Sequence, residues 1–430
     1  QVGADWNERT DGGDPAHHLP LYWSFEPHGL PVTTDAWRKQ AAKLAQRLLT
    51  LCSQPDKGNG LGDWLGNPYV MHIARLSLML ADHHYSSLGL DKTTGQPVAG
   101  RVPGQTDYPL FANTHDSVPR HSHGQKSGHC DPHQRNQTLD EHLLGVARHS
   151  ATVTHALPKF ETHLPRLGEC KPLKKRAKDE RFRWQDKAAD LAASLRTRSA
   201  EQGAFILNLA STGCGKTLGN ARIMYALADP VQGMRCAFAM GLRTLTLQTG
   251  RAFRDLLGLA DDELAIRVGG SASRALFEHH ERLAEQRGSA SAQALVEEDG
   301  HVVFEGNHEA HPVLQRVLHD PQAAKLLVAP LLVCTIDHLT PATESLRGGR
   351  QIAPMLRLMS GDLVLDEPDD FDLADLPALT RLVHWAGLLG ARVLLSSATL
   401  LLALVAGLFA AYRAGRTQFA RNRGQRPGVS

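Results

Sequence analysis

The chain has 430 residues, with 47 Lys or Arg, 45 Asp or Glu and a formal net charge of +2. This length suffices for two or three domains, and the balanced charge means that any nucleic-acid footprint must be local. Six scattered cysteines without a C-x-x-C pair argue against a disulfide framework or a zinc ribbon and indicate the reduced thiols of a cytoplasmic protein. The longest apolar run, at 400–412, is shorter than the ~20 residues of a bilayer-spanning helix, so it predicts a buried or partly buried helix and no membrane partner.

The first 165 residues are predicted to be mostly helical. Residues 35–52 place their apolar side chains on one helical face, and residues 67–88 are apolar almost all round, which predicts a helix running through a core. Residues 91–138 are rich in Gly, Pro, His and Ser and predict a long loop or insertion. This insertion holds several potential zinc ligands, but their spacing matches no standard finger, so a polar insertion is the favoured interpretation. The potential ligands are His115, His121, His123, His129, Cys130 and His133.

A basic segment follows. Nine Lys or Arg against four acids between Arg166 and Lys187 indicate a linker with a phosphate-facing surface, and an ordinary solvated linker is the alternative. Within it, the stretch "RFRWQDKA" contains Gln185, whose amide both donates and accepts hydrogen bonds and is predicted to recognise an adenine edge.

From residue 204 onward, short apolar runs alternate with helical stretches, which predicts a parallel sheet covered by helices. Ligands of such sheets bind beyond the carboxyl ends of the strands. The runs are "AFILNLA", "RCAFAMGL", "LLVCTIDH", "DLVLDEP" and "RVLLSSAT".

The stretch "ASTGCGKT", at 210–217, is predicted to be a phosphate-binding loop followed by a helix whose N-terminus faces the phosphates. Lys216 would reach the β and γ phosphates, and the Thr217 hydroxyl would bind magnesium. A coincidental Gly-rich turn is the alternative. The other loop residues expected to contact the nucleotide are Thr212, Gly213, Cys214 and Gly215.

Two further strand ends carry polar motifs. In "DLVLDEPDD", Asp366 is predicted to hold magnesium and Glu367 to orient or deprotonate the attacking water, although an acidic pair can also be a solvated turn. The sequence thus predicts that Lys216 and this doublet converge on one magnesium nucleotide. In "LLSSATL", the residues Ser397, Ala398 and Thr399 are predicted to couple nucleotide state to domain movement, with a helix N-cap as the alternative.

Residues near two more strand ends are candidates for contact with a nucleic-acid backbone through hydroxyl and basic groups, and a glycine pair elsewhere would permit close approach of a phosphate. They are Arg243, Thr244 and Thr249 in "GLRTLTLQTGRAF", Gly269 and Gly270 in "VGG", and Thr335 and His338 in "CTIDHL".

This ordered set of motifs resembles superfamily 2 helicases and, in wording, the CRISPR-associated helicase-nuclease of type I-F systems, where an HD nuclease domain precedes the helicase. The resemblance implies an α/β fold in which residues 204–430 form a first RecA-like lobe, a parallel sheet with helices on both faces. It also implies that residues 1–165 are the mostly α-helical C-terminal portion of an HD-type domain and that 166–203 are a linker with the adenine-recognition segment.

The same resemblance implies an ATP-hydrolysing translocase on single-stranded DNA, recruited by a crRNA-guided surveillance complex and coupled to metal-dependent DNA cleavage in antiviral defence. ATP and magnesium are the implied cofactors, with a transition metal at an incomplete HD site. Asp82 matches the closing carboxylate ligand of that site, a surface carboxylate being the alternative, and the adjacent His83 and His84 are further candidates.

The sequence departs from the family pattern at both ends. The "HD" dipeptide is absent, and only 31 residues follow Thr399, too few for a second RecA-like lobe. We therefore expect a fragment that binds nucleotide but turns it over poorly. The alternatives are another superfamily 2 DNA or RNA helicase and a catalytically incomplete docking fragment.

Overall fold

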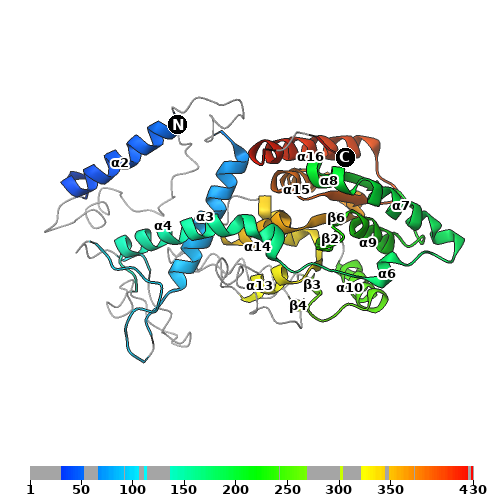
Figure 1. Cartoon of the computed structure of the whole chain (residues 1–430), viewed down its shortest axis with the longest axis horizontal. Coiled ribbons are helices and arrows are strands. Elements are labelled where there is room, and N and C mark those ends of the chain that lie inside the picture. Colours follow the sequence, from blue (N-terminus) through cyan, green and yellow to red (C-terminus); the bar gives the residue numbers. More distant parts are fainter. Residues whose placement is uncertain are drawn as a thin grey trace.

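The computed structural model describes residues 31–52, 66–91, 93–105, 111–113, 136–241, 243–268, 301–303, 321–343, 348–371, 373–424 and 428–429. The described elements form a sheet with a layer of helices on each face, and further helices extend from one end of this assembly (Figure 1). No described helix combines the length and the apolar composition needed to cross a membrane.

A seven-stranded sheet lies at the centre, in the order β1-β7-β6-β2-β5-β3-β4. The first six strands in this order are parallel, and β4 pairs antiparallel with β3 at one edge. All five predicted strands are confirmed, whereas β3 and β4 were missed. Their bounds are β1 (Phe205–Asn208), β2 (Cys236–Met240), β3 (Leu264–Val268), β4 (His301–Val303), β5 (Leu331–Thr335), β6 (Asp362–Asp366) and β7 (Val393–Ser396).

Both faces of the sheet are buried, because side chains alternate between the faces along each strand. Leu363 and Leu365 of β6 pack into one cluster, and Val364 packs into the other. The first cluster is covered by α13 (Pro321–Val328), α14 (Gly348–Ser360), α15 (Leu376–Leu389) and α16 (Leu402–Asn422). The second is covered by α6 (Lys171–Lys174), α7 (Arg183–Ser194), α9 (Lys216–Leu227) and α10 (Arg243–Leu257). This arrangement confirms the predicted RecA-like α/β class, and α16 contains the apolar run at 400–412.

Shorter helical elements lie between or before these longer ones. They are η2 (Pro31–Thr33), η4 (Leu157–Lys159), α5 (Phe160–His163), η5 (Glu180–Phe182), α8 (Arg196–Gln202), η7 (Ile336–His338), η8 (Thr340–Thr343) and η9 (Pro368–Asp370).

In the described part of the chain, three longer helices precede the sheet: α2 (Asp35–Cys52), α3 (Pro68–Ser87) and α4 (Leu139–Ala156). Helix α2 confirms the first helical prediction. Helix α3 also forms, but the expectation that it runs through a core holds for one side only, because Leu76 and Leu80 are buried while Met71 and Leu78 are 42% and 54% exposed. A run of apolar residues therefore overstated how much of this helix is covered.

Helices α3, α4 and α5, which precede the sheet, share a core with it. Leu76 of α3 and Phe160 of α5 belong to the same buried cluster as Leu363 of β6. At the N-terminus of α3, the Asn67 side chain accepts a hydrogen bond from the Val70 backbone N–H at 3.2 Å and caps the helix. The two segments on either side of residue 165 are thus joined by continuous apolar packing.

Candidate nucleotide-binding site

The carboxyl-terminal residues of five parallel strands lie in one row, and four of them are polar. Strand pairing puts Asn208 of β1 opposite Ser396 of β7, Ser396 opposite Asp366 of β6, Asp366 opposite Met240 of β2, and Met240 opposite Thr335 of β5. Because the strands are parallel, these residues all lie at the carboxyl edge of the sheet, where such folds bind ligands.

The "ASTGCGKT" stretch forms the connection from β1 to α9 at this edge. Gly213 and Gly215 have φ values of 74° and 73°, in the left-handed region that glycine adopts without steric cost. The buried Asn208 side chain accepts a hydrogen bond from the Ala210 N–H at 3.2 Å and donates to the Asn220 side chain at 2.7 Å. The start of the loop is therefore tied to both β1 and α9.

The loop lysine and the downstream acidic doublet meet. Lys216 Nζ forms a hydrogen-bonded ion pair with Glu367 Oε1, and the two side chains are 9% and 26% exposed. Glu367 directly follows β6, and its backbone N–H donates to the Ser396 carbonyl at 2.7 Å. Residues separated by 151 positions thus share one site.

Asp366 lies beside this pair in an environment that disfavours its charge. Burial raises the pKa of the Asp366 carboxyl, and the Glu367 carboxylate adds to this effect, while Ser396, Lys216 and Asn220 oppose it. Its Oδ1 atom is buried without a hydrogen-bond partner. An unpartnered carboxylate oxygen next to a second carboxylate fits a divalent cation that prefers oxygen ligands, so the residues present suit magnesium.

The "SSAT" segment joins neighbouring strand ends. Thr399 Oγ1 donates a hydrogen bond to the Asp369 carboxylate in the turn after β6, and the Ser397 N–H donates to the Asn208 carbonyl at 3.2 Å. Burial alone would raise the pKa of Asp369, but hydrogen bonds from Ser397 and Thr399 lower it below its ordinary value. The ends of β1, β6 and β7 are therefore linked through polar contacts, and a coupling role for Ser397, Ala398 and Thr399 stays a prediction.

Gln185 lies under the phosphate loop and is 2% exposed. Its Nε2 donates to the carbonyls of Gly215 at 3.1 Å and Cys214 at 3.4 Å, and its Oε1 accepts from Arg222 at 3.3 Å. Trp184, which sequence reasoning did not select, donates from its indole nitrogen to the Cys214 carbonyl at 3.1 Å. Only its position beside Gln185 could have signalled it.

The candidate nucleic-acid contacts are only partly brought together. Thr335 belongs to the strand-end row, but its side chain and that of Thr249 are buried, with 3% and 8% exposure. His338 is half-buried just beyond β5. Arg243 and Thr244 begin α10, and Gly269 and Gly270 lie outside the described residues. Their roles stay predictions.

Asp82 contacts His142 across α3 and α4, with 3.0 Å between Oδ1 and Nε2. His142 Nδ1 is in turn 2.9 Å from Gln137 Oε1. Among the described residues, no three His, Cys, Asp or Glu side chains are grouped so that they could hold a metal. His84 stacks on His149 with 3.9 Å between ring centroids, and the potential zinc ligands at 115–133 fall outside the described residues.

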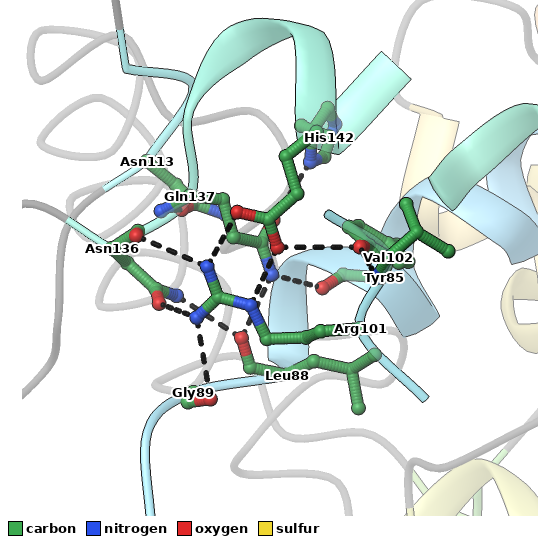
Figure 2. Close-up of polar contacts among 10 residues, drawn as sticks. Tyr85, Leu88, Gly89, Arg101, Val102, Asn113, Asn136, Gln137 and His142 are labelled. Atoms are coloured by element: carbon green, nitrogen blue, oxygen red, sulfur yellow. Dashed lines mark hydrogen bonds and ion pairs between the residues drawn. The ribbon is translucent and has the colours of Figure 1, made fainter. Parts of the chain in front are cut away.

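A buried polar network lies next to the contact between Asp82 and His142 (Figure 2). Arg101 forms a two-point ion pair with Glu141, at 2.5 Å and 2.7 Å, and also donates to the Asn136 side chain at 2.8 Å. The Tyr85 hydroxyl donates to Glu141 at 3.3 Å and accepts from the Val102 N–H at 2.9 Å. These bonds hold the segment after α3 against the start of α4.

The parallel sheet, the β1–α9 phosphate loop and the acidic end of β6 together define a RecA-like P-loop protein. Comparison with known proteins makes this more specific. The chain is 54% identical over 402 residues to the CRISPR-associated nuclease/helicase Cas3 subtype I-F/YPEST of Pseudomonas aeruginosa (strain UCBPP-PA14), covering 94% of this chain and 35% of that protein. It is 45% identical over 424 residues to the Cas3 of the same subtype from Pectobacterium atrosepticum, covering 97% of this chain and 36% of that protein.

The chain is therefore related to Cas3 proteins of subtype I-F over nearly its whole length, which confirms the resemblance seen in the motifs. It spans about a third of the length of these curated relatives. No protein-family model matches it. Among solved structures, the chain resembles T. fusca Cas3 with AMPPNP, with a TM-score of 0.41 and 18% identity over 67% of this chain and 29% of that one.

Proposed function

We propose that this chain is the nucleotide-binding motor portion of an ATP-dependent single-stranded DNA translocase. In this proposal, the motor is coupled to a metal-dependent DNA nuclease and acts in CRISPR interference in the cytoplasm. The observation that carries the proposal is the meeting of Lys216 with Glu367 at the row of strand ends. The relationship to proteins named nuclease/helicase Cas3 supports the same function.

Each residue of the site has a role in this proposal. Lys216 leaves Glu367 to contact the β and γ phosphates, while the N–H groups at the start of α9 bind the phosphate oxygens. Thr217 and Asp366 would hold magnesium, which supplies positive charge to the phosphates when bound. Once released from Lys216, Glu367 accepts a hydrogen bond from the attacking water and orients it.

The partners of the whole protein are also proposed. Single-stranded DNA would lie across the carboxyl edge of the sheet and bind mainly through its phosphates. A crRNA-guided surveillance complex would deliver that DNA, as the relatives' CRISPR-associated name suggests. The helices before the sheet would contribute Asp82 to a nuclease metal site.

Two substitutions test the motor. Lys216→Ala should abolish MgATP binding, because it removes the cation that contacts the phosphates, whereas Glu367→Gln should retain binding and lower hydrolysis by about 10²-fold or more. Calorimetry measures the binding, and phosphate release measures the hydrolysis with and without single-stranded DNA or RNA. Unchanged MgATP binding in Lys216→Ala would refute the proposed site, and stimulation by RNA alone would favour an RNA helicase.

A further inference from the structure

The indole of Trp184 and the side-chain amide of Gln185, both on α7, donate hydrogen bonds to backbone carbonyls of the phosphate loop. We propose that Trp184 and Gln185 act as positioning residues, which aim two backbone N–H groups of the loop at a bound polyphosphate. This inference rests on the proposed function of the loop and assigns Gln185 a role other than adenine recognition.

Peptide geometry connects these side chains to the ligand. In a trans peptide, the N–H of a residue points opposite to the carbonyl of the residue before it. Trp184 Nε1 donates to the Cys214 carbonyl at 3.1 Å, which sets the direction of the Gly215 N–H. Gln185 Nε2 donates to the Gly215 carbonyl at 3.1 Å, which sets the direction of the Lys216 N–H. Since both carbonyls are held on the α7 side, both N–H groups face away from it.

The Gln185 amide has little capacity left for a base. Its nitrogen serves two carbonyls and its oxygen accepts from Arg222, which is itself ion-paired with Asp186. The side chain is 2% exposed. Reading an adenine edge would require breaking bonds that hold the loop, so phosphate binding and base recognition would compete for one amide.

Two glycines make this contact sterically possible. A Cβ at Gly219 would lie 2.4 Å from the Trp184 ring, and a Cβ at Gly215 would lie 2.8 Å from Gln185 Nε2. Only residues without a side chain at these positions let α7 approach the loop and the first turn of α9 this closely. These glycines therefore leave room for Trp184 and Gln185 beside the loop, and Gly215 also provides the left-handed backbone conformation of the turn.

The experiment compares affinities of the full chain for MgATP, MgGTP and inorganic triphosphate by calorimetry. Trp184→Phe keeps a ring but removes the indole N–H, and Gln185→Met keeps an uncharged side chain of similar length but removes the amide donor. We expect each variant to weaken binding of all three ligands in parallel, by about threefold to tenfold, because the Trp184 change removes one hydrogen bond donated to the loop and the Gln185 change removes two. The ratio of MgATP to MgGTP affinity should stay unchanged. Hydrogen exchange in the loop should become faster in both variants.

Leu191→Ala is the matched control, because Leu191 is on the same helix and is 63% exposed, and its affinities should equal those of the unaltered chain. A fall in MgATP affinity alone, with triphosphate binding unchanged, would overturn the inference and assign Gln185 to adenine. Unchanged affinities and loop exchange in both variants would also overturn it while leaving the proposed function intact. If the unaltered chain bound none of the three ligands, the proposed function and this inference would fail together.

Discussion

Glu367 shows how backbone strain is placed at the candidate site. Its φ of 49° lies in the left-handed region, and it is the one non-glycine residue there among the described residues. This conformation costs a non-glycine residue about 1–2 kcal/mol, and such strain persists where surrounding contacts hold it. Here the holding contacts are the N–H bond to Ser396 and the ion pair with Lys216. The sharp turn sets the Glu367 carboxylate against the loop lysine immediately after buried Asp366.

His72 supplies a prediction about acid stability. Burial lowers the pKa of His72 to about 4, and the charges of Arg75 and His384 add to this effect. The unfolded chain, with a pKa near 6.5, then binds more protons than the folded protein between these values, so stability falls as pH drops through this window. After allowance for partial exposure, we expect His72 to account for about 1–2 kcal/mol of that loss.

His72→Gln removes the titrating group and should flatten the dependence of stability on pH. Urea unfolding at about pH 7.5 and about pH 4.5 measures the free energy of unfolding in each protein. If the variant lost as much stability on acidification as the unaltered chain, this assignment to His72 would be wrong.

At the scale of elements, the contact between α15 and α16 depends on close backbone approach. A Cβ at Gly415 would lie 2.1 Å from the His384 carbonyl oxygen, and a Cβ at Gly387 would lie 2.5 Å from the Tyr412 carbonyl oxygen. Neither neighbour is a flexible side-chain end, so neither can move aside cheaply. These two helices cover β6 and β7, which carry the acidic doublet and the "SSAT" segment.

Gly415→Ala should therefore destabilise the protein by about 1–3 kcal/mol, because the added methyl group forces α15 and α16 apart. Gly407→Ala in the same helix is the matched control, since a Cβ there meets nothing within 4 Å. That change should be neutral or stabilise by up to about 1 kcal/mol, because alanine favours helix more than glycine. Thermal and urea unfolding measure both, and equal effects at the two positions would contradict the close-packing argument.

At the scale of the whole molecule, helices α3, α4 and α5 share one buried cluster with the sheet. Helices α3 and α4 lie beside the end of the layered α/β part in Figure 1. A domain boundary near residue 165, as predicted from composition and resemblance, would thus be crossed by apolar packing. Separate folding of the two parts would expose Leu76 and Phe160 to water.

We expect a single cooperative unfolding transition for this reason. Phe160 is fully buried, and Phe160→Ala should lower the free energy of unfolding by about 3–5 kcal/mol across that one transition. Coincident urea curves from circular dichroism and tryptophan fluorescence measure it. Leu78→Ala, at a position 54% exposed on α3, should cost less than about 1 kcal/mol. Two separate transitions, only one of them moved by Phe160→Ala, would contradict a shared core.

The parts of the fold that sequence predicted are those with a strong local signal. Strands β2, β5, β6 and β7 are continuous apolar runs because both faces of each are covered, and such runs are visible without knowledge of their neighbours. Strand β3 contains Arg267, and β4 has only three residues, so neither matched that pattern. The exposed side of α3 was missed because apolar content does not tell which residues a neighbouring helix covers.

The sequence by itself identified the candidate phosphate loop, since its glycines, lysine and threonine are adjacent in the chain and need no distant partner to be recognised. It also placed Asp366 and Glu367 at a strand end. The motifs also predicted that Lys216 and this doublet converge, but only the tertiary structure decided that Glu367 pairs with Lys216 directly and that Trp184 and Gln185 donate hydrogen bonds to the loop carbonyls. The physical reason is that strand order and the packing of α7 on α9 bring together residues that are far apart in the chain. The identity of an amino acid does not show which distant residue it will contact.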